Sequence, residues 1–371
     1  MERTFDAVII GGGPAGAACG ITLLKQNAEP CIIDKAVFPR HKTCAGLVTA
    51  KTYALIRELL DKEPPEELFC NRSSEVRLYH RTQLLTDAPL DRPVRLVSRS
   101  HFDNALINAY RAAGGTLREG EGDITIDYDQ KRVTLSNGDI LYYRSLVFAD
   151  GALSLSRRFT GIKNTDLAFG IEAYIPHRLM PIDSVNLYFG YLDSGYVWAF
   201  PHGDTVCVGA ADRFQKGEGY REILSAFLKE RGIEPEETRY IGAFLPYGKA
   251  ANQQGLPQDV LLIGDAAGLT DPISGEGLYM AMASGIHAAK AATQPQPKEA
   301  YLNSIAPLLR TVRDGVKAQR TFYAPLFHRV FLNRVKGNRR VVTFFFENMV
   351  HEYRYGYHDL QRLYRDYKQS K

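Results

Sequence analysis

The chain has 371 residues, enough for two domains or for one large discontinuous domain. Its hydrophobic content of 45% and charged content of 24% are ordinary for a globular protein, and they exclude a collagenous or wholly disordered chain. The net charge of +4 is too small to indicate nucleic-acid binding by itself. The five cysteines lie far apart and form no C-x-x-C pattern or Cys/His cluster, so we expect neither disulfides nor a metal site.

Residues 7–24 carry no charged side chain, but they do not predict a signal peptide or a membrane-spanning helix. Six glycine and proline residues interrupt the segment, and an acid, Asp6, precedes it where a signal peptide would carry basic residues. No other stretch is long and apolar enough to cross a bilayer. We therefore expect a cytoplasmic protein.

The amino-terminal residues follow the order of a dinucleotide-binding unit. Residues 5–10 predict a buried strand, residues 11–16 form a glycine-rich turn, and residues 17–26 predict a helix. A second predicted strand over residues 30–33 ends in Asp34. This combination of strand, turn, helix, strand and acid is much more specific than a glycine-rich turn alone.

Each glycine of the turn has a physical reason to be there. Gly11 permits the tight turn, Gly13 lets backbone N–H groups approach a pyrophosphate, and Gly16 allows the helix to pack closely on the strand. The helix amino terminus supplies roughly half a positive charge to the phosphates. Asp34, which lies 23 residues after Gly11, stands where an acid accepts hydrogen bonds from ribose hydroxyls. FAD and NAD both remain open at this point.

Two later strands each end in an acid followed by small residues. Residues 145–151 are an apolar run that ends in Asp-Gly, and residues 260–268 are an apolar run that ends in Gly-Asp-Ala-Ala-Gly. The second continues past Gly275 and Gly277 into a helix predicted over residues 279–292. An acid at a strand end can accept hydrogen bonds from a ribityl chain, and glycines leave room for a flat ring against the backbone. These features favour FAD.

In this order, the three elements resemble those of the FAD-dependent family of the glutathione-reductase type, and within it the p-hydroxybenzoate-hydroxylase-like group. The resemblance covers about residues 5–300 and implies noncovalently bound FAD. It places Arg40 and Arg99 near the adenosine and the pyrophosphate, although single arginines are also common surface charges. The residues that we expect to bind FAD are Gly11, Gly13, Pro14, Ala15, Gly16, Asp34, Lys35, Arg40, Cys44, Ala45, Gly46, Arg99, Asp150, Gly151, Gly264, Asp265, Pro272, Gly275, Glu276, Gly277 and Leu278.

Two local motifs are similar to those of the geranylgeranyl reductase family. Residues 39–47 resemble its P-R-x-K-x-C-G-G-G-L segment but carry Ala45 and Leu47 where glycines are usual, so the approach to the flavin could be narrower here. Residues 196–203 match its Y-x-W-x-F-P-x-G motif at every fixed position, including the only tryptophan of the chain. The departures in the first motif leave the substrate open.

The second motif predicts a strand whose aromatic side chains share one face. Tyr196, Trp198 and Phe200 alternate with smaller residues, and residues 185–191 and 205–211 flank them as further strands of an antiparallel meander. The aromatic face could roof a flavin pocket and line a channel for an apolar substrate, or it could only pack the core of the sheet.

The candidate catalytic residues are Cys44, Tyr196, Trp198 and Phe200. The family position of Cys44 places its thiol near the flavin, where it could donate a proton or gate the substrate. Alternatively, Cys44 is a small buried apolar residue. Because an isolated alkene is a poor hydride acceptor, its reduction also needs a proton, and the sequence does not identify the source. His41 and His202 are candidates, with solvent-facing turn positions as the alternative.

The carboxyl-terminal residues 310–371 contain fourteen Lys and Arg and five acids, a net charge of +9. Apolar residues at spacings of three and four predict amphipathic helices. Such a basic end suits contact with an anionic membrane surface. The alternative is a helical cap over the substrate domain with its basic face in solvent. No recognition motif accompanies the charge, so we do not expect nucleic-acid binding.

We therefore predict an α/β protein with a Rossmann-like FAD-binding domain, an inserted antiparallel β-sheet substrate domain and a C-terminal helical segment. The FAD-binding domain is discontinuous and comprises residues 1–60, 96–165 and 255–300, the substrate domain comprises 61–95 and 166–254, and the terminal helices comprise 301–371.

The resemblance implies an FAD-dependent oxidoreductase that saturates C=C bonds of an isoprenoid or other hydrophobic lipid. Two alternatives stay open: an FAD-dependent monooxygenase that hydroxylates a hydrophobic or aromatic substrate, and a flavin-bearing lipid-binding or electron-carrier protein. A halogenase is disfavoured because the W-x-W-x-I-P segment is missing. No second G-x-G-x-x-G marks a nicotinamide domain, so NAD(P)H and ferredoxin, a redox partner protein, both remain open as electron donors.

Overall fold

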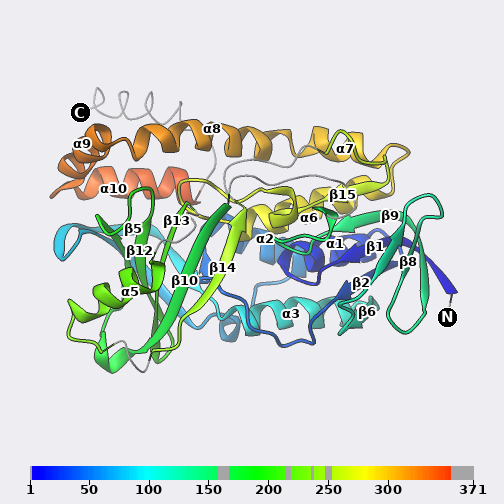
Figure 1. Ribbon diagram of the computed structural model, residues 1–371, viewed down its shortest axis with the longest axis horizontal. Helices are drawn as coiled ribbons and strands as arrows, with labels where there is room; N and C mark the ends of the chain where they lie inside the picture. Colours follow the sequence, from blue (N-terminus) through cyan, green and yellow to red (C-terminus); the bar gives the residue numbers. More distant parts are fainter. Residues whose placement is uncertain (1, 158–166, 214–218, 235–237, 247–252, 352–371) are drawn as a thin grey trace.

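The computed structural model describes residues 2–157, 167–213, 219–234, 238–246 and 253–351, and it contains two sheets that lie side by side (Figure 1). The strands of the first sheet in the described part of the chain are β1 (Glu2–Ile10), β2 (Pro30–Asp34), β6 (Thr116–Glu119), β7 (Thr125–Asp127), β8 (Arg132–Thr134), β9 (Ile140–Phe148) and β15 (Val260–Leu262). Those of the second sheet are β3 (Leu47–Val48), β4 (Asn71–His80), β5 (Gln83–Leu96), β10 (Leu167–Pro176), β11 (Val185–Phe189), β12 (Tyr196–His202), β13 (Thr205–Arg213) and β14 (Ile241–Pro246).

The first sheet has a parallel core. Its order is β6-β2-β1-β9, with β15 parallel to β9 on the other side and the antiparallel pair β8 and β7 extending from β9. The ends of β1 and β9 that lead into the glycine-rich turn and Asp150 are buried continuously, as in a parallel sheet covered on both faces. The helices around it are α1 (Pro14–Lys25), α3 (Arg99–Ala112), α6 (Leu278–Ala292) and α7 (Pro297–Ser304).

Small residues let α1 and α6 cross very closely. A Cβ atom at Gly285 would lie 2.3 Å from the carbonyl oxygen of Ala15, which is far inside van der Waals contact. The predicted helix over residues 17–26 begins earlier than expected, at Pro14, because proline is well tolerated in the first turn of a helix.

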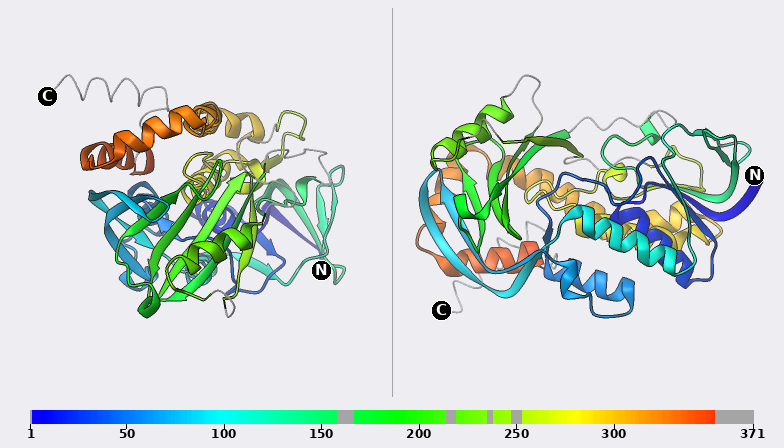
Figure 2. Two further views of the ribbon diagram at one scale, coloured as in Figure 1. Left: turned by 60° about the vertical axis from the view of Figure 1, so that its left-hand side comes forward. Right: turned by 90° about the horizontal axis from the view of Figure 1, so that it is seen from below.

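The second sheet is antiparallel except where β11 runs parallel to β4. The predicted meander is confirmed, because β11, β12 and β13 pair in sequence. One face packs against α5 (Tyr220–Lys229), and the opposite face packs against residues of α8 (Ala306–Phe322), α9 (Pro325–Val335) and α10 (Arg339–Phe345). Figures 1 and 2 show these terminal helices along one side of the molecule. The remaining helices are α2 (Ala50–Leu60) and the short turns η1 (Glu66–Leu68), η2 (His177–Leu179), η3 (Gly264–Ala267) and η4 (Phe346–His351).

Ion pairs and hydrogen bonds fix the terminal helices to the edge of this sheet. Arg92 pairs with Glu347 at 2.9 Å, and Arg339 pairs with Asp87 at 2.6 Å. The hydroxyl of Thr343 donates to the carbonyl of Pro89 at 2.8 Å. Residues of α10 and η4 therefore take part in the helical cap that we considered as the alternative to membrane contact. Part of the predicted basic segment, residues 352–371, lies outside the described residues.

The proposed domain segments follow the two sheets except at β3, whose two residues pair with β5 although we assigned residues 1–60 to the FAD-binding domain. Those boundaries remain a proposal, and residues 158–165 within them are not described. Among the helices that the structure describes, none has the length and apolar character needed to span a bilayer.

Candidate cofactor and catalytic site

The glycine-rich turn joins β1, β9 and α1 at distances that leave no space for side chains. Gly11 has a φ of +108°, and a Cβ there would lie 2.5 Å from the carbonyl oxygen of Ala149. A Cβ at Gly16 would lie 1.8 Å from the carbonyl oxygen of Gly11. The close strand–helix packing expected from the sequence is therefore present.

Gly13 is less crowded than its neighbours in the turn. Its backbone is extended, and among the described residues beyond its own chain neighbours an added Cβ would meet only Nη2 of Arg40, at a tight 3.3 Å. No side chain caps the start of α1, and its first turn carries no acid. The positive end of the helix dipole is thus open to an anion beside Gly13. Pro14 and Ala15 are buried in this first turn.

Asp34 ends β2 with its carboxylate turned toward the glycine-rich turn. The N–H groups of Gly12 and Ala36 donate to its two oxygens at 2.7 and 2.8 Å. Each oxygen keeps a further lone pair, so the side chain can still accept from a ligand hydroxyl. Lys35, by contrast, is exposed.

Arg40 and Arg99 converge on one buried acid. Asp103 is fully buried, receives two hydrogen bonds from Arg99 at 2.8 and 3.0 Å, and lies 3.4 Å from Arg40. Burial alone would lower the pKa of Arg99, but Asp103 and the neighbouring side chain of Cys44 raise it above its usual value. The structure therefore brings Arg40 to the glycine-rich turn, and Arg99 shares the Asp103 carboxylate with it.

The loop that carries Cys44 is folded against the second sheet. The N–H of Cys44 donates to Oε1 of Glu172 at 3.2 Å, and the N–H of Gly46 lies 3.4 Å from the Cys44 sulfur. Gly46 has a φ of +75°, and a Cβ there would meet the carbonyl oxygen of Val97 at 2.1 Å. Ala45 and Leu47, which stand where the family usually has glycines, pack against the hydrophobic core of the second sheet.

Asp150, at the end of β9, accepts hydrogen bonds from the turn that follows it. Asp150 accepts hydrogen bonds from the Ser154 hydroxyl and the Leu155 N–H, both at 2.5 Å. Burial nevertheless raises the pKa of Asp150 above its ordinary value. Gly151, next in the chain, has a φ of +84°, and a Cβ there would meet no atom within 4 Å.

Asp265 lies in η3, ahead of α6, and is partly exposed. Its Oδ1 accepts from the Thr270 hydroxyl at 3.2 Å and lies 3.5 Å from where a Cβ at Gly277 would stand. Gly264, which precedes it, has a φ of +54° and donates its N–H to the Ser284 hydroxyl. The carboxylate therefore faces the glycine-containing turn.

The turn between Asp271 and Gly277 is held from both sheets. Oδ1 of the buried Asp271 accepts from the N–H groups of Ile273 and Ser274 at 3.0 and 2.7 Å. The hydroxyl of Tyr196, from the second sheet, donates to the carbonyl of Ser274 at 2.5 Å. Tyr196, which we predicted to be catalytic, thus ties the aromatic strand to this turn. Pro272 and Leu278 are buried at its two ends.

Glu276 is turned toward α2. Its carboxylate lies 2.6 Å from the Lys51 ammonium and accepts from the Thr49 and Thr52 hydroxyls at 3.1 and 3.4 Å. Both charged side chains are only 9% exposed, so this is a buried ion pair. Its cofactor contact stays a prediction.

The predicted aromatic face is present. Tyr196, Trp198 and Phe200 all belong to the core on the side covered by the terminal helices, whereas Val197 and Ala199 face α5. The Trp198 ring lies over Gly209, where a Cβ would be 2.1 Å from it. Its indole Nε1 is buried, and the ring interacts with the Cys207 thiol on the neighbouring strand.

The sequence interpretation missed Glu172. This acid is fully buried on β10 and contacts the Cys44 loop. The available signal was a single acid between apolar residues in the strand Leu167–Pro176, where an unpaired charge is costly. Of the two histidines proposed as proton sources, His41 is exposed and His202 is partly buried, and desolvation lowers the pKa of both.

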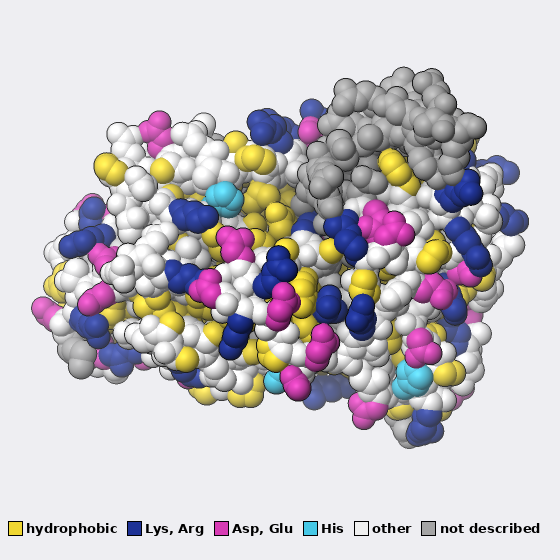
Figure 3. All heavy atoms as spheres, turned by 180° about the vertical axis from the view of Figure 1, so that it is seen from behind, with side chains coloured by type: hydrophobic (Ala, Val, Ile, Leu, Met, Phe, Trp, Pro, Cys, Tyr) yellow, Lys and Arg dark blue, Asp and Glu magenta, His cyan; other side chains and the backbone are white. Residues whose placement is uncertain are grey.

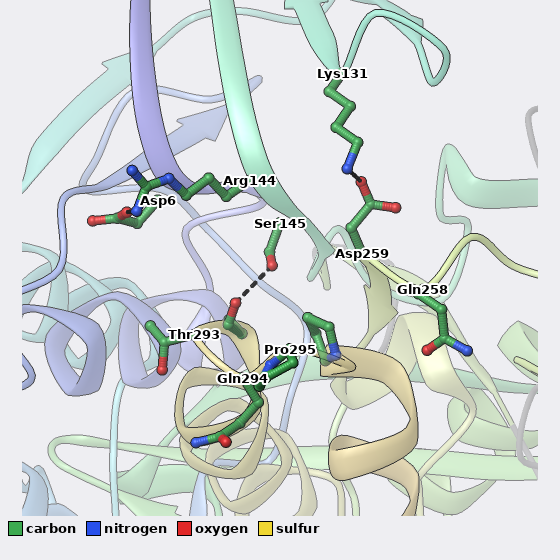
Figure 4. A pocket seen from close by; sticks show the side chains of 11 residues that line it. Asp6, Lys131, Arg144, Ser145, Gln258, Asp259, Thr293, Gln294 and Pro295 are labelled. Atoms are coloured by element: carbon green, nitrogen blue, oxygen red, sulfur yellow. Dashed lines mark hydrogen bonds and ion pairs between the residues drawn. The ribbon is translucent and has the colours of Figure 1, made fainter.

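A separate pocket of about 300 Å³ lies at the opposite end of the first sheet (Figure 4). It is lined by residues near the start of β9 and the end of α6, and Lys131 pairs with Asp259 there at 2.9 Å. Ser145 donates to the carbonyl of Ala292 at 2.8 Å. None of its lining residues is among those predicted to bind FAD, which gather at the carboxyl ends of the parallel strands.

Comparison with known proteins agrees with this geometry. A family described as pyridine nucleotide-disulphide oxidoreductase matches residues 5–178. The chain is 30% identical over 305 residues to a geranylgeranyl diphosphate reductase of Rhodobacter capsulatus, covering 78% of this chain and 75% of that protein. The chain belongs to the geranylgeranyl reductase family. Another member, a digeranylgeranylglycerophospholipid reductase of Picrophilus torridus, is 26% identical over 81% of each chain.

Solved structures show the same fold. A geranylgeranyl bacteriochlorophyll reductase-like protein of Thermoplasma acidophilum superposes with a TM-score of 0.80, at 18% identity, over 99% of this chain and 100% of that one. A probable FAD-dependent monooxygenase of Pseudomonas aeruginosa superposes with a TM-score of 0.69, at 17% identity, over 90% and 99%. The fold of the geranylgeranyl reductase family thus also occurs among monooxygenases, and fold alone does not decide the reaction.

This geranylgeranyl reductase family member is an FAD-dependent oxidoreductase. The described residues fit that cofactor: an open space beside Gly13 that a Cβ would fill, an uncapped helix start, and the buried acceptor Asp34 lie together. On the other side, the partly exposed Asp265 offers a further acceptor.

Proposed function

We propose that this protein saturates C=C bonds in the prenyl chain of an isoprenoid lipid or diphosphate. The observation that carries the proposal is the aromatic face of β12, which is joined to the turn at Ser274 through Tyr196 and covered by the terminal helices. Phe189, Trp198 and Phe200 line this face, and apolar and aromatic side chains suit a long hydrocarbon. The named relatives, which are reductases of geranylgeranyl compounds, support the same substrate class.

We further propose how the described residues would hold FAD. Gly13 and the start of α1 would receive the pyrophosphate, with Arg40 beside them. Asp34 would accept from the ribose of the adenosine, and Asp265 from the ribityl chain. Gly275 and Gly277 would leave the backbone of the turn accessible to the ring.

FAD, when bound and reduced, would supply a hydride. The residues of the protein must exclude water and deliver a proton. The cap of terminal helices excludes water from the aromatic face, which favours entry of an apolar chain. A proton must reach the carbon that does not receive the hydride, because an isolated alkene cannot stabilise a carbanion. Cys44 is our proposed donor, because its loop lies between Arg99 and the second sheet and its side chain is partly exposed.

The test is an anaerobic incubation of the FAD-loaded protein, reduced chemically with dithionite, with geranylgeranyl lipids and geranylgeranyl diphosphate. Chemical reduction removes the choice between NAD(P)H and ferredoxin from the experiment. We expect products heavier by two hydrogens for each reduced bond, detected by mass spectrometry. Unchanged prenyl compounds across the panel would contradict the proposal, and incorporation of labelled oxygen in air would favour a monooxygenase instead.

We also propose that α9 contacts an anionic membrane surface from which such a lipid enters. Leu326 and Val330 are 79% and 40% exposed and lie four residues apart, so they share one side of the helix, with Arg329 also exposed. Figure 3 shows Lys and Arg interspersed with acids over the face that it displays. The proposal rests on this exposed side of α9.

A further inference from the structure

A buried polar cluster lies in the middle of the apolar face of the second sheet. Glu172 on β10 pairs with Gly209 on β13, and Gly209 pairs with Trp198 on β12. Directly paired residues of antiparallel strands project to the same side, so Glu172 and Trp198 share the face that we propose for the substrate. Because Gly209 has no side chain, the indole ring of Trp198 can lie directly over its backbone.

Three donors surround the Glu172 carboxyl group. The Cys44 N–H and the Tyr174 hydroxyl lie 3.2 and 3.3 Å from Oε1, and the Cys207 sulfur lies 3.8 Å from Oε2. The described part of the chain contains no ion pair to Glu172. Burial raises the pKa of Glu172 to about 7, although the Cys44 N–H, Tyr174, Lys42 and Cys207 each lower it. This acid therefore exchanges its proton near neutral pH.

A cation flanks the same loop from the opposite side. Arg99 interacts with the Cys44 side chain as well as with Asp103, and the Gly46 N–H approaches the Cys44 sulfur at 3.4 Å. Arg40, Arg99 and Lys42 surround this loop, and Asp103 balances only one of their charges. A negative charge on Glu172 would still repel one on the Cys44 sulfur at the same loop, so the loss of one proton disfavours the loss of the other.

We propose that Cys44 and Glu172 form a coupled pair that holds one acidic proton next to the aromatic face, with Glu172 acting on the reaction through Cys44. This inference rests on the proposed reductase function and extends it by naming the group that replenishes the proton of Cys44. Glu172 is a positioning residue in this scheme, because its side chain contacts the Cys44 backbone and not the substrate.

Each proton in this scheme has a source and a destination. The S–H bond of Cys44 breaks and its proton forms a C–H bond on the alkene, while the other new C–H bond uses the hydride. The carboxylic acid of Glu172 then returns a proton to the thiolate sulfur. The resulting carboxylate regains a proton from water when the saturated product leaves, so each turnover consumes one proton from solvent.

The groups that face Glu172 must all be considered in its pH dependence. The Cys44 loop contributes Lys42 and Cys44, and α3 contributes Arg99 with its partner Asp103. The sheet contributes Tyr174 of β10 and Cys207 of β13. His202 of β12 is included because its ring contacts that of Tyr174. Only Cys44 and Glu172 change charge in the scheme. Burial raises the pKa of Cys207 and Tyr174 well above their usual values, which keeps both neutral near pH 7.

The experiment measures the alkylation rate of Cys44 by iodoacetamide in the FAD-loaded protein, between about pH 5 and 10, by mass spectrometry of its peptide. In Glu172→Gln the second negative charge cannot form, so we expect alkylation of Cys44 at pH 7 to be about tenfold faster. Cys70, which is also partly exposed, serves as the reference in the same digest and should react at an unchanged rate.

A purely structural Glu172 predicts another result, because glutamine keeps an acceptor oxygen for the Cys44 N–H. An unchanged Cys44 profile in Glu172→Gln would therefore overturn the proposal, as would absence of Cys44 labelling at every pH. If that variant does not fold, Tyr174→Phe replaces it: loss of one donor favours the neutral acid, and Cys44 should react about twofold to threefold faster at pH 7. No change there overturns the proposal equally. Alkylation needs no lipid substrate, so failure of the reductase assay remains a separate outcome.

Discussion

The open space beside Gly13 can be tested by filling it with one methyl group. In the absence of FAD, Gly13→Ala should fold normally, because the backbone there is extended with a φ of −67°. Among the described residues, the new Cβ meets only Nη2 at the end of the Arg40 side chain, at 3.3 Å. We expect the free energy of unfolding of the apoprotein to change by no more than about 0.5 kcal/mol.

FAD binding should respond very differently. The methyl group stands where we propose that a phosphate approaches the N–H groups at the start of α1, and a hydrogen bond to a charged group contributes about 1.5–3 kcal/mol. Loss of one such bond corresponds to a rise in Kd of about tenfold to a hundredfold. Isothermal titration of the apoprotein with FAD measures this value, and urea unfolding of the same preparation measures the stability.

Gly16→Ala and Gly255→Ala are the matched controls. A Cβ at Gly16 must move by more than about 1 Å to clear the Gly11 carbonyl, so this variant should lose at least about 3 kcal/mol or fail to fold. A Cβ at Gly255 meets nothing within 4 Å, so that variant should match the parent in both measurements. The reasoning is refuted if Gly13→Ala binds FAD as tightly as the parent, or if it is destabilised as severely as Gly16→Ala.

Three further predictions concern stability, the inter-sheet contact and the surface. In the folded protein Glu172 keeps its proton up to about pH 7, whereas a glutamate in the unfolded chain loses its proton near the ordinary pKa of 4.5. Because the folded state then binds more protons than the unfolded state, the free energy of unfolding of the parent falls as the pH rises between these two values. In urea unfolding, Glu172→Gln should therefore gain up to about 3 kcal/mol relative to the parent at pH 8 compared with pH 4, and equal differences at both pH values would contradict this. Tyr196→Phe removes the hydrogen bond to the Ser274 carbonyl and should lower the free energy of unfolding by about 1–2 kcal/mol; an unchanged urea midpoint would show that the bond contributes nothing. Leu326→Glu should reduce co-sedimentation with anionic vesicles at least severalfold without changing the unfolding midpoint, and equal sedimentation of variant and parent would exclude α9 as the contact.

The sequence predicted best those features that depend on neighbours in the chain. The turn at Gly11 and Gly16 follows from local backbone geometry, and the alternation in 196–202 places three aromatic side chains on one face whatever the partner strands are. The family resemblance and the FAD assignment came from the order of such local segments.

The sequence could not predict contacts between segments that are far apart in the chain. Cys44 and Glu172 are 128 residues apart, and their contact depends on the register of β10 and on the path of the Cys44 loop across it. Tyr196 and Ser274, 78 residues apart, meet only because the two sheets are placed side by side. For the terminal helices, the sequence predicted the helices but not what they cover. An amphipathic helix has the same pattern of apolar residues whether it packs on a sheet or on a membrane.

The position of Trp198 gives the protein a built-in optical probe. It is the only tryptophan of the chain, and it lies over Gly209 on the face where we propose that hydrocarbon and flavin meet. All indole emission therefore originates at this single place, and an oxidised flavin nearby would quench it by resonance energy transfer. Cofactor loading and the arrival of a lipid tail could then be followed in real time by fluorescence, without attaching any dye.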